Sequence, residues 1–239
     1  MKNLPIGVFD SGVGGLFVLE KLIKYFPNES FVYLGDNNNV PYGNKPADEI
    51  RERTLYNIER LVSLGVKAVV IACNTASLNL CDESFLYVPI FKLNPIMELQ
   101  KVVNKKGCFI GTVSTVNKLL EDKRIKNMKK LQFFSLKFLA ENIEKKLLYG
   151  EKCVLSDHLM TTNENYDFLY LGCTHYLYLK DEVKHFFKVD TVFDGVDSIK
   201  ENLFNYLEKY NLFSKNNQVV SFIGECKSVN EKVFYSLSR

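Results

Sequence analysis

Residues 68–75 read Ala-Val-Val-Ile-Ala-Cys-Asn-Thr, an unbroken apolar run that ends in a thiol, an amide and a hydroxyl. A short, continuously apolar segment is typical of a strand that is buried on both faces of a parallel sheet. Residues 169–175, Leu-Tyr-Leu-Gly-Cys-Thr-His, have the same design. Two separate buried strands are therefore predicted to end in a cysteine, Cys73 in the first and Cys173 in the second.

Strand-like runs alternate with helix-like stretches on both sides of these segments. The predicted strands include residues 6–9, 31–34, 108–111, 192–193 and 219–223, and the predicted helices include residues 16–25, 47–64 and 198–210. Residues 133–138 are ambiguous between the two patterns. Such alternation indicates βαβ units and hence parallel sheets.

Polar residues also follow a second strand upstream of each cysteine. Asp10, with Ser11 after it, lies 63 positions before Cys73, and Thr112 lies 61 positions before Cys173. Ligands bind at the carboxyl ends of strands in open α/β sheets. The repetition predicts two similar doubly wound parallel-sheet α/β domains that face each other, with the active site in the cleft between them. We assign residues 1–95 plus 206–239 to the first domain and residues 96–205 to the second.

The bulk composition argues against several classes of protein. A net charge of +3 over 239 residues, with acids among the lysines, gives no patch for nucleic acid. No apolar run approaches the length of a membrane span, and no signal peptide precedes the first strand. The six cysteines include no Cys-x-x-Cys pair, so we expect free thiols in a reducing cytoplasm and no metal site.

The two strand-ending cysteines are the candidate catalysts. A lone cysteine is usually a small buried apolar residue. We expect that role for four others: Cys81, Cys108, Cys153 and Cys226. Cys73 and Cys173 differ because amide, hydroxyl or imidazole groups follow them directly. A free thiol has a pKa of about 8.5, so a modest shift makes it a base near neutral pH.

Three further motifs have both a structural and a functional interpretation. Residues 10–15, Asp-Ser-Gly-Val-Gly-Gly, form either a capped turn or a turn whose amides hold an anion. His175 is either structural or placed to set the charge of Cys173. Residues 36–43, Asp-Asn-Asn-Asn-Val-Pro-Tyr-Gly, are either a surface loop or the source of two substrate contacts, the Tyr42 hydroxyl and the Gly43 amide.

In this order, the motifs resemble the glutamate racemase family of bacteria. The resemblance is carried by residues 6–15, 35–36, 41–43, 72–77, 111–115 and 171–176, and by a C-terminal strand and helix. It implies interconversion of L- and D-glutamate, which supplies D-glutamate for peptidoglycan, without a cofactor. It also implies two α/β domains around the active site, and a homodimer.

The family pattern assigns roles to individual residues of this chain. By that pattern Cys73 and Cys173 are the two catalytic thiols, assisted by Asp10 and His175. The substrate contacts implied are Asp10, Ser11, Tyr42, Gly43, Asn74, Thr75, Thr112, Thr115, Thr174 and His175. A further acid of the second domain is assigned to Glu144, with Glu141 as the alternative.

The chain departs from the family pattern in places, and two other functions stay open. The family usually has a Thr and a basic residue within residues 37–39, where this chain has three asparagines, and a Pro where it has Leu177. One alternative is a racemase for aspartate or another acidic amino acid. The other is a non-catalytic binding protein with the same fold. The opening motif favours the glutamate branch, and the intact thiols argue against a loss of catalysis.

Overall fold

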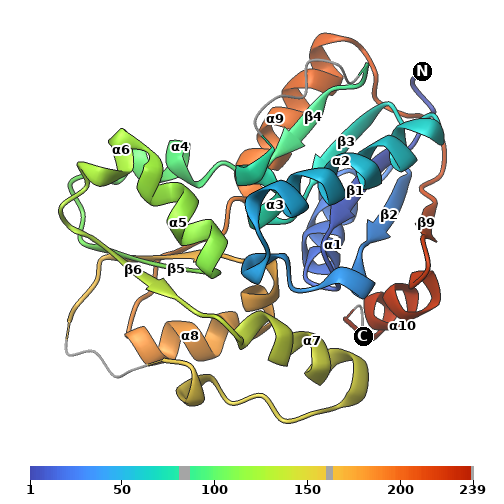
Figure 1. Ribbon diagram of the computed structural model, residues 1–239. Helices are drawn as coiled ribbons and strands as arrows, with labels where there is room; N and C mark the ends of the chain where they lie inside the picture. Colours follow the sequence, from blue (N-terminus) through green and yellow to red (C-terminus); the bar gives the residue numbers. More distant parts are fainter. Residues whose placement is uncertain (81–86, 160–163, 238–239) are drawn as a thin grey trace.

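Two parallel β-sheets form the framework of the computed structural model, which describes residues 1–80, 87–159 and 164–237 (Figure 1). Within this part of the chain, the strand orders are β4-β3-β1-β2-β9 and β6-β5-β7-β8, and the strand pairs run parallel. The first sheet contains β1 (Ile6–Asp10), β2 (Phe31–Gly35), β3 (Ala68–Ile71), β4 (Ile90–Lys92) and β9 (Val220–Ile223). The second contains β5 (Gly107–Gly111), β6 (Leu131–Ser135), β7 (Phe168–Gly172) and β8 (Val192–Phe193). The predicted α/β class with two parallel sheets is confirmed.

Helices connect the strands and cover the sheets. The α-helices are α1 (Gly15–Tyr25), α2 (Ala47–Ser63), α3 (Asn74–Asn79), α4 (Pro95–Gln100), α5 (Val113–Glu121), α6 (Lys123–Lys126), α7 (Leu139–Tyr149), α8 (Lys180–Phe187), α9 (Val196–Lys209) and α10 (Lys227–Leu237). Short 3-10 helices are η1 (Asn37–Asn39), η2 (Tyr42–Asn44), η3 (Leu155–Asp157) and η4 (Thr174–Leu179). None of the helices in the described ranges is both long and apolar enough to span a membrane.

The two halves repeat one arrangement around their central strands. β1 pairs with β3 in the first sheet, as β5 pairs with β7 in the second. Strand β1 ends at Asp10 and Thr112 follows β5, while Cys73 and Cys173 follow the carboxyl ends of β3 and β7. The predicted strands therefore end where the sequence repeat placed them, and the polar groups gather at the carboxyl edges.

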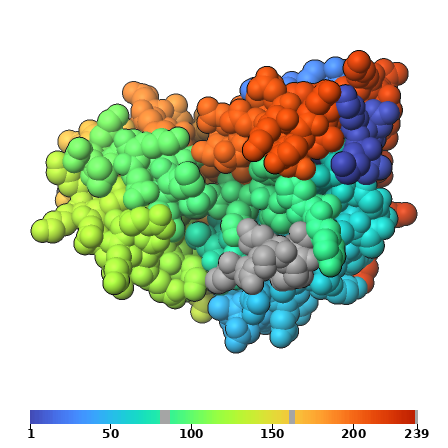
Figure 2. Space-filling view, turned by 90° about the horizontal axis from the view of Figure 1, so that it is seen from above, coloured from blue at the N-terminus to red at the C-terminus, as the bar shows by residue number. Residues whose placement is uncertain are grey.

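Helix α9 crosses the predicted boundary between the two domains. α9 begins just after β8 and packs against α1 and β4. Seen from above, its orange-red residues lie against the dark-blue amino terminus (Figure 2). Position 206 lies inside this helix, and the division into residues 1–95 plus 206–239 and 96–205 stays a prediction.

The structure also shows the environment of residues 133–138 and of three of the four cysteines that were not expected to be catalytic. Residues 133–138 contain the end of β6 and the loop that leads into α7. Cys108 is buried and Cys153 is half-buried against the core, while Cys81 lies outside the described residues. The prediction that Cys226 is a buried apolar residue is wrong. It is half-buried, and its thiol donates a hydrogen bond to Asn38 Oδ1 at 3.3 Å, because it lies in a polar loop before α10.

A buried ion pair joins three segments at the amino edge of the first sheet. Lys67 Nζ lies 2.5 Å from Glu29 Oε2, and both side chains are at most 2% exposed. Lys67 Nζ also donates to the carbonyls of Lys2 and Leu212, and Glu29 Oε1 accepts from the Ser214 amide. Burial lowers the pKa of Lys67, and the Glu29 carboxylate opposes this effect.

We expect Glu29→Gln to lower the free energy of unfolding by about 3 kcal/mol, because it leaves a lysine charge buried without a counter-ion. Urea unfolding measures the change. The control is Glu20→Gln, which breaks the pair with Lys24, whose side chain is 72% exposed, and should change the free energy by less than about 1 kcal/mol. Equal losses in the two variants would contradict the role assigned to the buried pair.

Candidate active site

A small cavity lies where the carboxyl ends of the two sheets meet. Its walls come from the segments after β1, β2, β3, β5 and β7 and from the start of α7. The lining residues are Ser11, Val40, Pro41, Tyr42, Gly43, Cys73, Asn74, Thr75, Thr112, Ala140, Cys173, Thr174 and His175. Both cysteines of the sequence repeat therefore open onto one cavity rather than into separate cores.

Cys73 occupies the junction between β3 and α3. Its sulfur lies 3.5 Å from Ser11 Oγ and accepts a hydrogen bond from the Ala76 amide at 3.5 Å, so the thiol also caps α3. Burial raises the pKa of Cys73 to about 12, and the negative charge of Asp10 adds to this effect. In this environment Cys73 keeps its proton at neutral pH.

Cys173 lies in a different electrostatic environment. Its sulfur is 3.8 Å from His175 Nδ1, and His175 Nε2 is 2.6 Å from Glu144 Oε2. Burial alone would lower the pKa of His175, but the contacts with Cys173 and Glu144 outweigh burial and raise this pKa well above its usual value. The imidazole of His175 therefore lies between the Cys173 sulfur and the Glu144 carboxylate.

The structure brings Glu144, rather than Glu141, to His175. Glu144 is 3% exposed and faces inward from α7. Glu141, one turn earlier on the same helix, forms an ion pair with Lys145 at 2.8 Å, and this pair is partly exposed to solvent. The structure therefore directs Glu144 inward to the imidazole and Glu141 outward to Lys145.

The glycine-rich turn after β1 holds carboxylates of the protein itself. The Gly12 amide donates to Asp10 Oδ1 at 2.9 Å, and the Val13 amide donates to Glu144 Oε2 at 3.0 Å. A Cβ at Gly12 would lie only 2.7 Å from Glu144 Oε2, so this position needs a residue without a side chain. The turn thus uses its amides for anions, and one of them belongs to the other half of the molecule.

Asp10 lies behind the cavity wall instead of lining it. The side chain is fully buried, and its Oδ2 accepts a hydrogen bond from Thr174 Oγ1 at 3.1 Å. Burial raises the pKa of Asp10 to about 6, although the positive charge of His175 and the Gly12 and Thr174 hydrogen bonds oppose the shift. Asp10 is therefore a carboxyl group that titrates close to neutral pH.

Three threonine hydroxyls from the two halves contact one another. Thr75 Oγ1 lies 3.0 Å from both Thr112 Oγ1 and Thr115 Oγ1, and Thr112 and Thr115 are 2.9 Å apart. Thr75 belongs to α3, whereas Thr112 caps α5 and Thr115 lies in its first turn. Thr75 and Thr112 line the cavity, and Thr115 lies directly behind them. This cluster joins the halves at the edge of the site.

Two other predicted contacts have distinct surroundings. The Tyr42 hydroxyl donates to Asp36 Oδ2 at 2.6 Å, and Tyr42 and Gly43 line the cavity. Among the described residues Asn74 Oδ1 is buried without a hydrogen-bond partner. An unpaired acceptor in a cavity wall can receive a donor from a ligand.

Sequence reasoning missed some residues of the site. The cavity is also lined by three apolar residues, Val40, Pro41 and Ala140. Their side chains have no polar or titratable group that would have marked them as candidates in the sequence. Asn37 donates from Nδ2 to Glu144 Oε1 at 2.8 Å. The run of three asparagines was visible as a departure from the family pattern, yet nothing in it indicated a contact with Glu144, 107 positions away.

Comparison with known proteins agrees with this geometry. No family model matches the chain. The chain is 34% identical over 229 residues to the glutamate racemase of Clostridium botulinum (strain Alaska E43 / Type E3), which covers 89% of this chain and 87% of that protein. It is 36% identical over 229 residues to the glutamate racemase of Clostridium perfringens (strain ATCC 13124), covering 90% and 87%.

A solved structure has the same fold over nearly its whole length. The glutamate racemase of Francisella tularensis, crystallised with D-glutamate, superposes with a TM-score of 0.79 at 26% identity, covering 98% of this chain and 95% of the other. Sequence identity above 30% over most of both curated relatives, together with this superposition, settles the classification. The chain belongs to the glutamate racemase family.

Proposed function

We propose that this protein interconverts L- and D-glutamate, with Cys73 and Cys173 as the two groups that exchange a proton with the substrate Cα. The observation that carries the proposal is that the two thiols line one cavity in opposite electrostatic environments. Relatives at 34–36% identity are glutamate racemases, and a structural neighbour was crystallised with D-glutamate.

Racemisation needs two proton-transfer groups on opposite faces of one carbon. A proton leaves Cα on one side, and another must arrive on the other side. One base held by a rigid strand end cannot easily reach both faces, whereas two opposed thiols can. The repeat of the fold supports this reading, because each half contributes one cysteine at the carboxyl end of a central strand.

The two environments suit complementary roles in a single turnover. Beside the His175 cation, a Cys173 thiolate takes the Cα proton, while protonated Cys73 donates its own proton to the opposite face. The turnover leaves Cys173 protonated and Cys73 as the thiolate, which is the form that accepts a proton from the product enantiomer. The reverse reaction therefore restores the first form, and the sum of protons on the two thiols stays constant.

The polar walls support binding of an amino acid and stabilisation of the carbanion. Donors must face the carboxylate at Cα as negative charge develops there, and one such donor has been worth about 3 kcal/mol in another enzyme. Thr75, Thr112 and Thr174 offer hydroxyls from both halves, and the unpaired Asn74 Oδ1 suits the substrate ammonium. Contacts from Ser11, Tyr42, Gly43 and Thr115 belong to the same proposal.

Asp10 and His175 are proposed to control the charges of the thiols. Asp10 raises the pKa of Cys73 while it is ionised, and its own pKa of about 6 allows it to take a proton near neutral pH. His175, oriented by Glu144, carries the charge that faces Cys173. These two residues thus act on the two thiols separately.

The remaining parts of the proposal concern the cell and the assembly. We propose that the D-glutamate formed enters peptidoglycan, that the enzyme acts in the cytoplasm, and that it is a homodimer. Support for these points comes from the family alone. Light scattering in solution tests the dimer.

We expect both Cys73→Ala and Cys173→Ala to fold and to lose racemisation by about 1000-fold or more, since each removes one acid or base. Chiral chromatography with glutamate and with aspartate measures the activity and separates the two substrates. The native enzyme in heavy water should place deuterium at Cα. Cys153→Ala, outside the cavity, is the control and should stay close to native. A Cys73 or Cys173 variant with near-native activity would remove that thiol from the mechanism.

We expect Asp10→Asn to be more stable than the native protein at pH 7.5. The pKa of Asp10 rises from 3.8 to about 6 on folding, so the unfolded chain releases this proton first. The native protein therefore loses up to about 3 kcal/mol of stability as pH rises from about 4 to about 6, and asparagine avoids that loss. Urea unfolding at pH 4 and pH 7.5 measures the gap, which should close at the lower pH. A variant less stable than native at pH 7.5 would contradict the argument.

A further inference from the structure

An asparagine outside the cavity holds the carboxylate that orients His175. Glu144 Oε1 accepts from Asn37 Nδ2 at 2.8 Å, and Glu144 Oε2 faces His175 Nε2 at 2.6 Å. The Val13 amide lies 3.0 Å from Oε2 and 3.4 Å from Oε1. Within the described part of the chain, Asn37 is thus the one side chain besides His175 that is hydrogen-bonded to this carboxylate.

The chemistry of the groups determines which way the Asn37 amide points. An ionised carboxylate only accepts hydrogen bonds, so the amide nitrogen of Asn37 must face Glu144. Its oxygen then faces α10, where Asn230 Nδ2 donates to it at 3.0 Å. Asn230 is fully buried, and its Oδ1 has no hydrogen-bond partner among the described residues. A buried acceptor without a partner is unfavourable, so its presence in a folded protein calls for an explanation.

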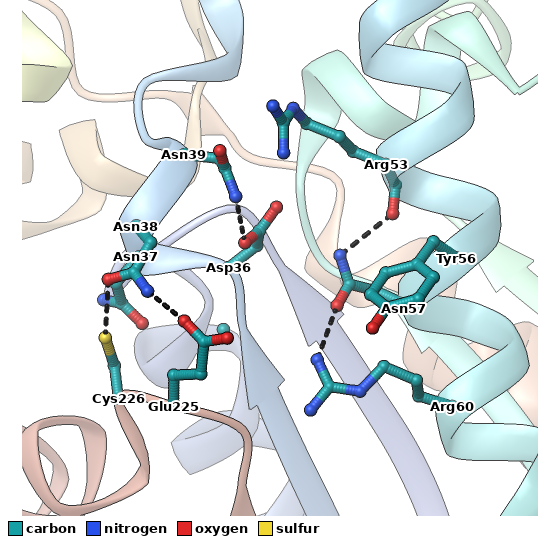
Figure 3. Close-up of a pocket in the computed structure, with 11 residues that line it drawn as sticks. Asp36, Asn37, Asn38, Asn39, Arg53, Tyr56, Asn57, Arg60, Glu225 and Cys226 are labelled. Carbon is teal, nitrogen blue, oxygen red and sulfur yellow. Dashed lines mark hydrogen bonds between the residues drawn. The ribbon is translucent and has the colours of Figure 1, made fainter.

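The absence of a side chain at Gly35 leaves room for the Asn37 and Asn230 amides. A Cβ at Gly35 would lie 2.8 Å from Asn37 Oδ1 and 2.9 Å from Asn230 Nδ2. The next residue of η1 is anchored to the same region, because Asn38 contacts the side chains of Glu225 and Cys226 just before α10 (Figure 3). The 3-10 helix η1 is therefore hydrogen-bonded to α10 and the residues just before it through two successive asparagines, and both of them line a polar surface cavity.

We propose that Asn37, itself held by Asn230, is a positioning residue for proton transfer at Cys173. It fixes the Glu144 carboxylate, so that His175 keeps Nε2 on Glu144 and presents Nδ1 to the Cys173 sulfur. The inference rests on the proposed function for its effect on catalysis. Neither asparagine lines the cavity, so their effect falls on kcat rather than on substrate binding.

Several other titratable groups interact electrostatically with the Glu144 carboxylate. They are Asp10 from β1, Tyr33 from β2, His175 and Tyr178 in η4, and Cys226 before α10. Cys173 contacts His175 in turn. Asn37 is neutral among them, so replacing it by an acid adds one new charge at a known place. This makes the position suitable for a test by pH.

The test compares Asn37→Asp with Asn38→Asp across pH. At low pH a protonated aspartic acid at position 37 can donate to Glu144 as the amide does, whereas at high pH two carboxylates face each other and repel. We expect kcat of Asn37→Asp relative to native to fall about tenfold or more between pH 6 and pH 9, with KM nearly unchanged. Asn38→Asp makes the same substitution one residue later, beside Glu225, and should follow the native profile.

A second variant and a second measurement keep the test independent of folding and of the assay. Asn230→Ser, which shortens the donor to Asn37, should lower kcat several-fold without a new pH dependence. The chain has three histidines, so the His175 signals in NMR can be assigned with His175→Gln. Asn37→Asp should raise the pKa of His175 above its native value, and Asn38→Asp should not.

The outcomes separate this inference from the proposed function. A native enzyme that fails to racemise glutamate would overturn the proposed function, while a shift in the His175 titration would still support the positioning role. An active native enzyme with an Asn37→Asp variant that matches it at every pH, and an unmoved His175 titration, would overturn the inference. Loss of activity in Asn37→Asp at all pH values with a native His175 titration would also overturn it.

Discussion

The hydrogen bond between Glu144 and His175, 2.6 Å long and almost wholly removed from solvent, is the constraint on which the site depends. A carboxylate in such a place needs donors, because an isolated buried charge is strongly unfavourable. The donors come from the imidazole, from the Val13 amide and from Asn37. Since Glu144 belongs to the second half and Val13 and Asn37 to the first, this one charge ties the halves together at the cavity.

The repeated fold and the unequal thiols have separate physical origins. Two similar sheets, each ending a central strand in cysteine, bring the sulfurs to one cavity. Their charges then depend on neighbours that do not repeat, namely Ser11 and the buried Asp10 near Cys73 and His175 beside Cys173. Fold symmetry thus brings two thiols to one cavity, and local asymmetry gives them different electrostatic neighbours.

Predictions from the sequence succeeded where burial alone determines structure. The largely apolar runs before Cys73 and Cys173 are the central strands β3 and β7, because strands covered on both faces of a parallel sheet bury nearly all of their side chains. Strand β4 and helix α4 were not predicted, since Ile90–Lys92 is short and half-buried and Pro95–Gln100 has few buried residues. The helix that carries Glu144 was also missed, because its pattern mixes charged and apolar residues.

The sequence by itself determined the parallel α/β class, the strand ends at which the polar groups gather, and the two thiols. Those features follow from hydrophobic runs and from the chemistry of adjacent residues, which are local properties of a chain. Only the tertiary structure decided that Glu144 rather than Glu141 reaches His175, that Asp10 lies behind the wall, and that Asn37 holds Glu144. Each of these depends on contacts between the two halves, such as those of Asp10 with Thr174 and of Asn37 with Glu144. Residues more than a hundred positions apart leave no local pattern of their contact in the sequence.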